Sequence, residues 1–326
     1  MPQITLVEAV NLALKREMQD NENVVVLGQD VGVDGGVFRA TLGLAERFGA
    51  ERVIDTPLAE ALIIGMAIGM ATEGLRPVAE IQFAGFVYTT IDQILNHAGR
   101  MRHRTRGRLT CPLVMRTPCG AGIHAPEHHS ESPESVFAHI PGIRVVYPSS
   151  PRRAYGLLLA AIRDPDPVVF LEPTRLYRLF KEDVEDNGEM LALDNCFTLR
   201  EGTDVTLVSW GAMAQDTLAA AADLAEEGIN AEVIDVATLK PLDMDTILAS
   251  VAKTGRCVIV SEAARTCGFA SEIAANLAED GLLTLLAPVV RVTGYDVVVP
   301  LPRLEKHYMP GKARIMRAVK KVVEFS

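Results

Sequence analysis

Short runs of aliphatic residues, many of them β-branched, alternate along the chain with longer segments of helical periodicity. In the first half, these runs predict strands at Val24–Leu27, Pro77–Ile81, Pro112–Met115, Ile143–Tyr147 and Val168–Leu171, and the longer segments predict helices over residues 5–19, 58–73, 88–103 and 151–163. A second series predicts strands over 205–210, 231–236, 256–261 and 288–293, and helices over 213–227, 243–253, 268–280 and 311–324. Strands that alternate with helices build parallel sheets covered on both faces, so the pattern predicts an α/β fold with two parallel-sheet domains.

The two series are separated by residues 176–203, which are polar and weakly periodic. The charged stretch Lys181–Glu189 contains a glycine and lacks an apolar face, which is typical of a linker with room for a hairpin. We place the boundary near residue 190, which gives predicted domains of residues 1–190 and 191–326.

The segment Asp55-Thr-Pro-Leu-Ala-Glu60 leads into the predicted helix 58–73. Thr56 is suited to cap a helix and Pro57 to its first position, where no N–H bond is lost. Residues 61–71 are apolar on every face, so we expect the helix to be buried all round. Gly65 and Gly69 would let another backbone approach closely, which favours tight helix–helix packing, including packing across a subunit interface.

Glu60 lies in the first turn of this apolar helix. One interpretation is purely structural, because the helix dipole favours a carboxylate there by about 0.3–1 kcal/mol. A carboxylate that points into an apolar core is costly unless it is paired, however. A ring nitrogen that shares a proton with it is one candidate partner.

Four of the seven histidines fall within residues 119–142, at positions 124, 128, 129 and 139. Their spacing matches neither a zinc finger nor HExxH, which argues against a zinc site. A loop rich in glycine and proline that carries adjacent histidines is a natural active-site lining, since histidine titrates near neutral pH. Histidines on an ordinary surface loop are the alternative.

Charge and composition exclude several classes of function. The net charge of the 326 residues is −10, which disfavours general nucleic-acid binding, and the basic run Arg100–Arg108 is better explained as a solvated or interface-facing helix end. Gly32, Gly35 and Gly36 form no nucleotide-binding motif. Without a signal peptide, a span-length apolar run or paired cysteine spacing, the chain is expected in the cytoplasm, away from membranes.

Several motifs together resemble one family, in order and over essentially the whole chain. They are Leu27-Gly-Gln-Asp-Val-Gly, Asp55-Thr-Pro-Leu-Ala-Glu60, Gly74-Leu-Arg-Pro-Val, Ile91-Asp-Gln-Ile, His128-His-Ser-Glu-Ser-Pro-Glu, Pro141-Gly-Ile-Arg-Val-Val, Ile162-Arg-Asp-Pro-Asp-Pro-Val and Leu239-Lys-Pro-Leu-Asp. The chain resembles the beta subunit of the decarboxylating component of 2-oxo acid dehydrogenase complexes, of the pyruvate or branched-chain type.

The resemblance implies a pyrimidine-binding domain followed by a transketolase C-terminal-type domain. It also implies two alpha and two beta chains, with thiamine diphosphate held between an alpha and a beta chain, and a lipoyl-bearing acyltransferase core as a further partner. The family's magnesium–diphosphate motif, Gly-Asp-Gly followed some 25–30 residues later by Asn, is absent from this sequence. We therefore expect the alpha subunit to hold the magnesium ion.

The resemblance also assigns roles to individual residues. Glu60 matches the glutamate that activates the aminopyrimidine ring, and His129, or its neighbour His128, matches the histidine that assists acyl transfer to the lipoyl group. The residues matching the pyrimidine pocket are Gln29, Leu58, Ala59, Glu60, Gln82 and Phe86. Those matching a structural potassium site of some relatives are Leu113, Ala161, Asp164 and Asp166.

The substrate is the point that the sequence leaves open. Pyruvate and branched-chain 2-oxo acids are both compatible with the sequence. The residues Pro133-Glu134 slightly favour the branched-chain type. An acetoin-dehydrogenase-type or other transketolase-like enzyme half and a non-catalytic scaffold are the alternatives, and the presence of both Glu60 and His129 argues against a scaffold. A ferredoxin-linked enzyme is disfavoured because the sequence has no cysteine cluster for an iron–sulfur centre.

Overall fold

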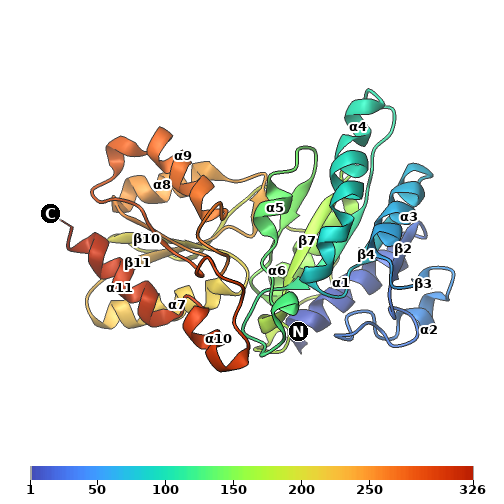
Figure 1. The fold of residues 1–326 in the computed structure, drawn as a ribbon, viewed down its shortest axis with the longest axis horizontal. Coiled ribbons are helices and arrows are strands. Elements are labelled where there is room, and N and C mark those ends of the chain that lie inside the picture. Colours follow the sequence, from blue (N-terminus) through green and yellow to red (C-terminus); the bar gives the residue numbers. More distant parts are fainter. Residues whose placement is uncertain (1, 326) are drawn as a thin grey trace. The chain divides into compact units, whose positions relative to one another are not determined.

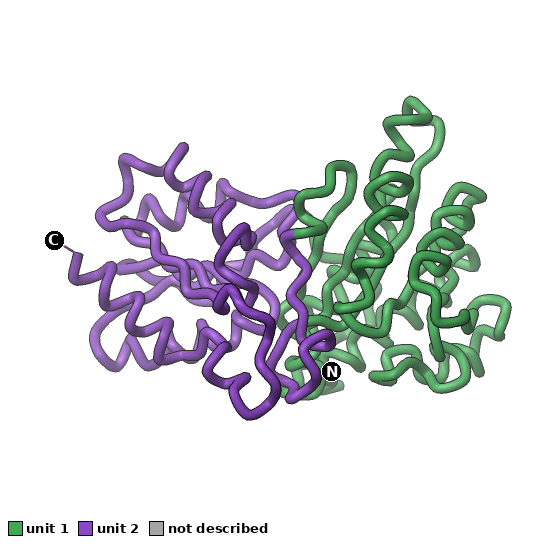
Figure 2. The backbone as a smooth tube through the Cα atoms, in the orientation of Figure 1, with its two compact units in different colours: residues 1–119, 136–193 green, residues 120–135, 194–326 purple. Residues whose placement is uncertain are grey.

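The computed structural model describes residues 2–325, which form two compact units. The first unit contains residues up to 119 and residues 136–193, and the second contains residues 120–135 and those from 194 onward (Figure 2). The chain therefore leaves the first unit for a short excursion, residues 120–135, that packs with the second. No helix among the described residues is long and apolar enough to cross a membrane.

The first unit is built on a parallel sheet with the strand order β6-β7-β5-β4-β2-β3 (Figure 1). Its strands are β2 (Val24–Gly28), β3 (Val53–Asp55), β4 (Arg76–Glu80), β5 (Val114–Cys119), β6 (Arg144–Val146) and β7 (Val168–Pro173). A separate antiparallel pair joins β1 (Gln3–Ile4) to β8 (Glu182–Asp183). The central strands are buried along their whole length, as expected for a parallel sheet covered on both faces.

Helices cover this sheet, and three of them, α1, α3 and α6, correspond to predicted helices. They are α1 (Leu6–Asp20), α2 (Leu44–Phe48), α3 (Glu60–Thr72), α4 (Met101–Arg104) and α6 (Pro151–Arg163), with α5 (Glu134–Ala138) spanning the return from the second unit. The α6 helix has the predicted bounds because Ser150 caps it and Pro151 occupies its first turn. The α1 and α6 helices pack against each other, and α3 packs on β2 and β4.

The predicted helix 88–103 is irregular in the structure. A 3₁₀ segment (Ala84–Thr90), a π-helical turn (Gln93–His97) and a second 3₁₀ turn (Ala98–Arg100) precede α4. Single π turns within a helical stretch are frequent at functional sites.

The α3 helix corrects two expectations about its start and burial. It begins at Glu60 with Ala59 in the capping position, so Thr56 is not the cap and Pro57 is not in the first turn. The helix is also not buried all round, because Leu62 is 47% exposed and Gly69 has no atom within 4 Å of an added Cβ. One apolar face of α3 therefore lies uncovered by the described residues of the chain.

The second unit contains a five-stranded sheet with the order β14-β13-β10-β11-β9, parallel except for β9. Its strands are β9 (Phe197–Arg200), β10 (Val205–Ser209), β11 (Ala231–Asp235), β13 (Cys257–Val260) and β14 (Val290–Val292); the short β12 (Thr238–Lys240) follows β11 in the sequence. Its helices are α7 (Met213–Glu226), α8 (Met244–Thr254), α9 (Ala270–Asp280), α10 (Pro302–Tyr308) and α11 (Lys312–Val323).

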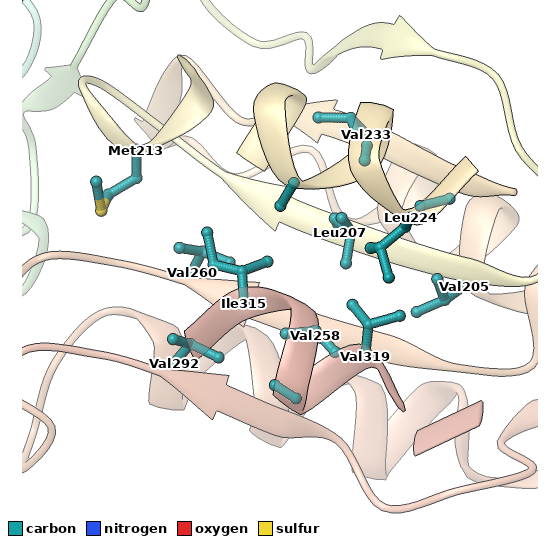
Figure 3. Close-up of a cluster of buried hydrophobic side chains, with 14 of the residues drawn as sticks. Val205, Leu207, Met213, Leu224, Val233, Val258, Val260, Val292, Ile315 and Val319 are labelled. Carbon is teal, nitrogen blue, oxygen red and sulfur yellow. The ribbon is translucent and has the colours of Figure 1, made fainter. Parts of the chain in front are cut away.

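The core of the second unit is aliphatic. Leu207, Val258 and Val260 on the strands meet Leu224 of α7 and Val319 of α11 (Figure 3). All five side chains are fully buried. Both units are thus α/β layers built on parallel strands, which confirms the predicted fold class.

Candidate active site

The first sheet has a topological switch point at the carboxyl ends of β2 and β4, the position at which α/β sheets form a ligand crevice. These strands are neighbours, but the chain runs from β2 to β3 on one side and from β4 to β5 on the other. Connections that diverge in this way leave an opening above the sheet, where α/β proteins bind their ligands.

Gln29 and Gln82 lie at this crevice, directly after β2 and just after β4. The Gln82 side-chain amide donates to the Gln29 carbonyl at 3.3 Å and to the Asp30 carboxylate at 3.2 Å. The side-chain carbonyl of Gln29 and the hydroxyl of Thr56, which follows β3, are buried without a hydrogen-bond partner among the described residues. Unpaired buried polar atoms are costly, so this crevice offers hydrogen bonds to a polar ligand.

Leu58, Ala59 and Glu60 join β3 to α3 and place Glu60 in the first turn of that helix. Glu60 is partly exposed, and Leu58 is 65% exposed. The carboxylate of Glu60 is therefore not enclosed by its own chain, in contrast to the expectation of a fully buried side chain.

Phe86 belongs to an aromatic cluster next to Gln82. Its ring lies 6.0 Å from that of Phe83, which in turn lies 5.5 Å from Phe38. Phe38 also contacts Tyr177, with ring centroids 5.2 Å apart. The cluster includes Phe38 and Phe83, which the family motifs do not contain, and Phe83 directly follows Gln82.

A buried charge network that the sequence did not reveal lies on β4, β5 and β7. The Arg116 guanidinium binds Glu172 through two hydrogen bonds of 2.7 Å and also binds Glu80. Burial raises the pKa of Glu80, an effect that Arg116 opposes. The Tyr177 hydroxyl donates to Glu172. The network ties β4, whose carboxyl end leads to Gln82, to β5 and β7.

The histidine-bearing loop belongs to the second unit. Glu127–His129 forms a short 3₁₀ turn in which the rings of His128 and His129 lie 4.1 Å apart. Burial and the nearby charge of His128 lower the pKa of His129, which favours a neutral ring. His129 is half-buried, whereas His128 is exposed.

Of the four residues matched to a potassium site, Ala161 lies near the end of α6, Asp164 and Asp166 lie in the loop between α6 and β7, and Leu113 directly precedes β5. Arginines bind both aspartates. Arg76 donates to the Asp164 carbonyl at 3.2 Å, while Arg144 and Arg102 pair with the Asp164 and Asp166 carboxylates at 2.8 Å each. Leu113 accepts the Val168 N–H in the sheet. Guanidinium groups therefore supply positive charge to both carboxylates, and the potassium site stays a prediction.

Among residues 2–325, no group of three or more His, Cys, Asp and Glu side chains is arranged to hold a metal ion. The four histidines of the loop region therefore do not form a metal cluster with neighbouring carboxylates or thiols in the described structure.

Comparison with known proteins agrees with this architecture. Residues 2–179 match the family described as the transketolase pyrimidine-binding domain, and residues 195–315 match the transketolase C-terminal domain. Over 325 residues and the full length of both chains, the sequence is 47% identical to the pyruvate dehydrogenase E1 component subunit beta of Bacillus subtilis and 46% identical to that of Staphylococcus epidermidis.

A solved structure titled as a split-gene transketolase, an inactive beta4 tetramer, has a similar fold. The TM-score is 0.78 at 26% identity, over 99% of each chain. The sequence identity is nearly one half over the full length, and two domain families match in the same order. The switch point at β2 and β4 agrees with these matches. The chain belongs to the transketolase-like, thiamine-diphosphate-dependent family, among the beta subunits of the decarboxylating component of 2-oxo acid dehydrogenase complexes.

Proposed function

We propose that this chain, together with an alpha subunit, decarboxylates pyruvate and transfers the acyl group to a lipoyl group. The observation that carries the proposal is the switch point at β2 and β4, where the buried polar atoms of Gln29 and Thr56 lack partners in the described chain. Glu60 begins α3 in the segment that leaves the neighbouring strand β3. Pyruvate is chosen because the most similar relatives are named for it.

The residues of the crevice suit an aminopyrimidine ring. Glu60 would accept a hydrogen bond from a ring nitrogen and hold the proton there, while Gln29 and Gln82 would bind the ring's polar edge. Phe86 would pack against the apolar part of the ring, as part of the aromatic cluster with Phe83. When bound, thiamine diphosphate supplies a nucleophilic carbon and an electron sink for decarboxylation.

His129 would act later, in the acyl transfer to the lipoyl group. Its lowered pKa keeps the ring neutral near pH 7, so it is ready to accept a proton.

An alpha subunit would complete the site. Leu58 and Leu62, at the head of α3, are 65% and 47% exposed, which is unusual for large apolar side chains beside a ligand crevice. The sequence also lacks the motif that holds magnesium and the diphosphate. We propose that the alpha subunit covers this face of α3, holds magnesium and contributes to an assembly of two alpha and two beta chains.

The decisive test is Glu60→Gln in the assembled enzyme. The neutral amide keeps the side chain's shape but cannot hold the proton as a carboxylate does. We expect thiamine diphosphate binding to survive and decarboxylation to fall by about two decades or more, since a role worth several kcal/mol is removed.

Glu73→Gln is the matched control for this variant, because Glu73 caps the other end of the same helix and is exposed. It should retain full activity. Near-normal turnover of Glu60→Gln, with Glu73→Gln also active, would remove Glu60 from the mechanism.

A second variant, His129→Ala, separates the two steps. Decarboxylation measured with an artificial electron acceptor should persist better than lipoyl acylation. His139→Ala serves as the control, since His139 is exposed and lies just after α5. Equal losses of both activities in His129→Ala contradict the role given to His129.

A further inference from the structure

Two buried glutamates of the second unit bind the backbone of the histidine-bearing loop. Glu305, on α10, accepts the N–H of Gly122 at 2.7 Å and that of His124 at 3.2 Å. Glu262, which follows β13, accepts the N–H of Ala121 at 3.0 Å. Both carboxylates are almost fully buried, at 3% and 2% exposure for Glu262 and Glu305. The family motifs single out neither residue.

The backbone of this segment is shaped to bind carboxylates. Gly120, Gly122 and His124 all have positive φ, of 90°, 92° and 59°. Alternation of such conformations along a chain turns successive N–H groups toward one side, where they bind an anion. A left-handed conformation is unfavourable for histidine, so the bond from its N–H to Glu305 offsets a real cost.

Backbone hydrogen bonds within the loop connect the segment held by the glutamates to the turn that bears the two histidines. The Gly120 N–H donates to the Glu131 carbonyl at 2.8 Å, which closes residues 120–131 into a loop. The His129 N–H donates to the Pro126 carbonyl at 3.0 Å, and the Ser130 N–H donates to the Glu127 carbonyl at 2.9 Å. The turn that bears His128 and His129 is therefore part of a closed loop, and the two glutamates hold the first residues of this loop, 121–124.

The far end of the excursion is anchored in the same unit. Glu134 is fully buried, and the indole N–H of Trp210 donates to it at 3.3 Å. The loop thus has a fixed beginning and a fixed end, while its middle, with His128, is exposed.

We propose that Glu262 and Glu305 are positioning residues for acyl transfer: by holding the backbone of residues 121–124 they fix the place of His129. This inference rests on the proposed function, since it assigns the two glutamates to the step that His129 serves. Neither glutamate needs to touch a substrate. Acidic side chains suit the task because a carboxylate makes stronger hydrogen bonds to backbone N–H groups than a neutral acceptor does.

The test is Glu305→Ala, with Glu305→Gln as the milder variant, in the assembled enzyme with thiamine diphosphate. Acyl transfer to the lipoyl group should fall about tenfold or more in Glu305→Ala, because small displacements of a catalytic group are expensive. Decarboxylation with an artificial electron acceptor should change by less than about threefold. Hydrogen–deuterium exchange should speed up in peptides covering residues 120–131.

Glu232→Gln is the matched control. Glu232 is also a buried glutamate of the second unit that accepts a backbone N–H, from Gly202 at 3.2 Å, but it lies on β11 and binds Lys253. It should leave both the ratio of the two activities and the exchange of residues 120–131 unchanged. A purely structural role of Glu305 would instead lower both activities in parallel, as would be seen for general unfolding of the unit.

A second pair of variants keeps the inference testable if Glu305→Ala does not fold. A Cβ added at Gly120 would lie 2.8 Å from a Glu262 carboxylate oxygen, whereas one added at Gly228, also in the second unit, meets nothing within 4 Å. Both glycines have positive φ, so the backbone penalty of alanine is similar. Gly120→Ala should lower acyl transfer selectively, and Gly228→Ala should not.

The outcomes separate this inference from the function on which it rests. If His129→Ala loses acyl transfer selectively but Glu305→Ala and Gly120→Ala do not, the positioning role is wrong and the proposed function stands. If His129→Ala itself shows no selective loss, the role of His129 fails, and the positioning role fails with it.

Discussion

His128 and His129 are adjacent in sequence, yet the structure gives them different surroundings. His128 is exposed, whereas His129 is half-buried. Burial is the larger cause of the lowered pKa of His129, and the charge of His128 lowers this pKa further. A neutral ring accepts a proton, so the rate of acyl transfer should rise as the pH increases through the pKa of His129. Because that pKa is lowered, the rise should occur at a lower pH than for an unperturbed histidine.

His128→Gln should move this rise to higher pH. Glutamine carries no charge, so the repulsion that disfavours protonation of His129 disappears and its pKa increases. The measurement is the pH dependence of acyl transfer between about pH 5 and 8, the range over which histidine titrates. The pH dependence of decarboxylation with an artificial acceptor should stay unchanged. If the rise in acyl transfer stays at the same pH or moves to a lower pH in His128→Gln, His129 is not the titrating group.

At the scale of elements, α3 combines two properties that rarely coexist. It is apolar throughout, and one of its faces is left uncovered by the described chain, with Leu62 half exposed and open space around Gly69. Exposed apolar faces commonly mark sites where another protein binds. The helix that presents Glu60 therefore also presents the surface where a partner would bind.

Leu62→Lys tests this interpretation. In the isolated chain the side chain is partly solvated already, so the melting temperature should change by no more than about 2 °C. Assembly with the alpha subunit should weaken by about tenfold or more, because a buried lysine would lack a partner. Leu283→Lys is the control, since Leu283 is fully exposed in the second unit. Unchanged assembly affinity of Leu62→Lys would exclude this face as the interface.

The arginine that joins β4, β5 and β7 has its own consequence for stability. Arg116→Met leaves Glu80 and Glu172 buried without their cation, and the loss of one partner of such a pair costs about 3–5 kcal/mol. We expect the melting temperature to fall by roughly 10 °C. Arg102→Met is the control, because it removes an exposed ion pair with Asp166. It should change the melting temperature by less than about 2 °C. Equal effects of the two substitutions would contradict this account.

For the whole molecule, the proposed function divides the chemistry between chains. Under this proposal the chain contributes Glu60 and His129 from different units, while the motif for magnesium and diphosphate is absent from its sequence. We therefore expect the isolated chain to release no carbon dioxide from any 2-oxo acid.

Reconstitution with an alpha subunit and thiamine diphosphate should produce thiamine-dependent loss of carbon dioxide from pyruvate. Turnover of pyruvate should exceed that of a branched-chain 2-oxo acid and of acetoin, each assayed with the same preparation. Preference for a branched-chain acid or for acetoin would overturn the substrate while leaving the family unchanged. Absence of activity with all three would favour the scaffold alternative.

Periodicity alone predicted most long elements, because the parallel strands are buried on both faces and the helices are amphipathic or apolar over many residues. The α6 helix matches its predicted bounds, since its cap and its first-turn proline are local signals. Short elements such as β3 and α10 were missed because three to seven residues carry too little pattern. The start of α3 was misplaced, because tertiary contacts overrode the local signals at Thr56 and Pro57.

The sequence by itself determined the α/β class, the family and the candidate residues Glu60, Gln29, Gln82 and His129, because these depend on local pattern and on motifs in order along the chain. Only the tertiary structure decided that residues 120–135 pack with the second unit, that Glu262 and Glu305 bind that segment, and that Arg116 joins Glu80 and Glu172. Those contacts link residues 36 to 183 positions apart. No local pattern records such pairings, because they depend on how distant segments are folded against each other.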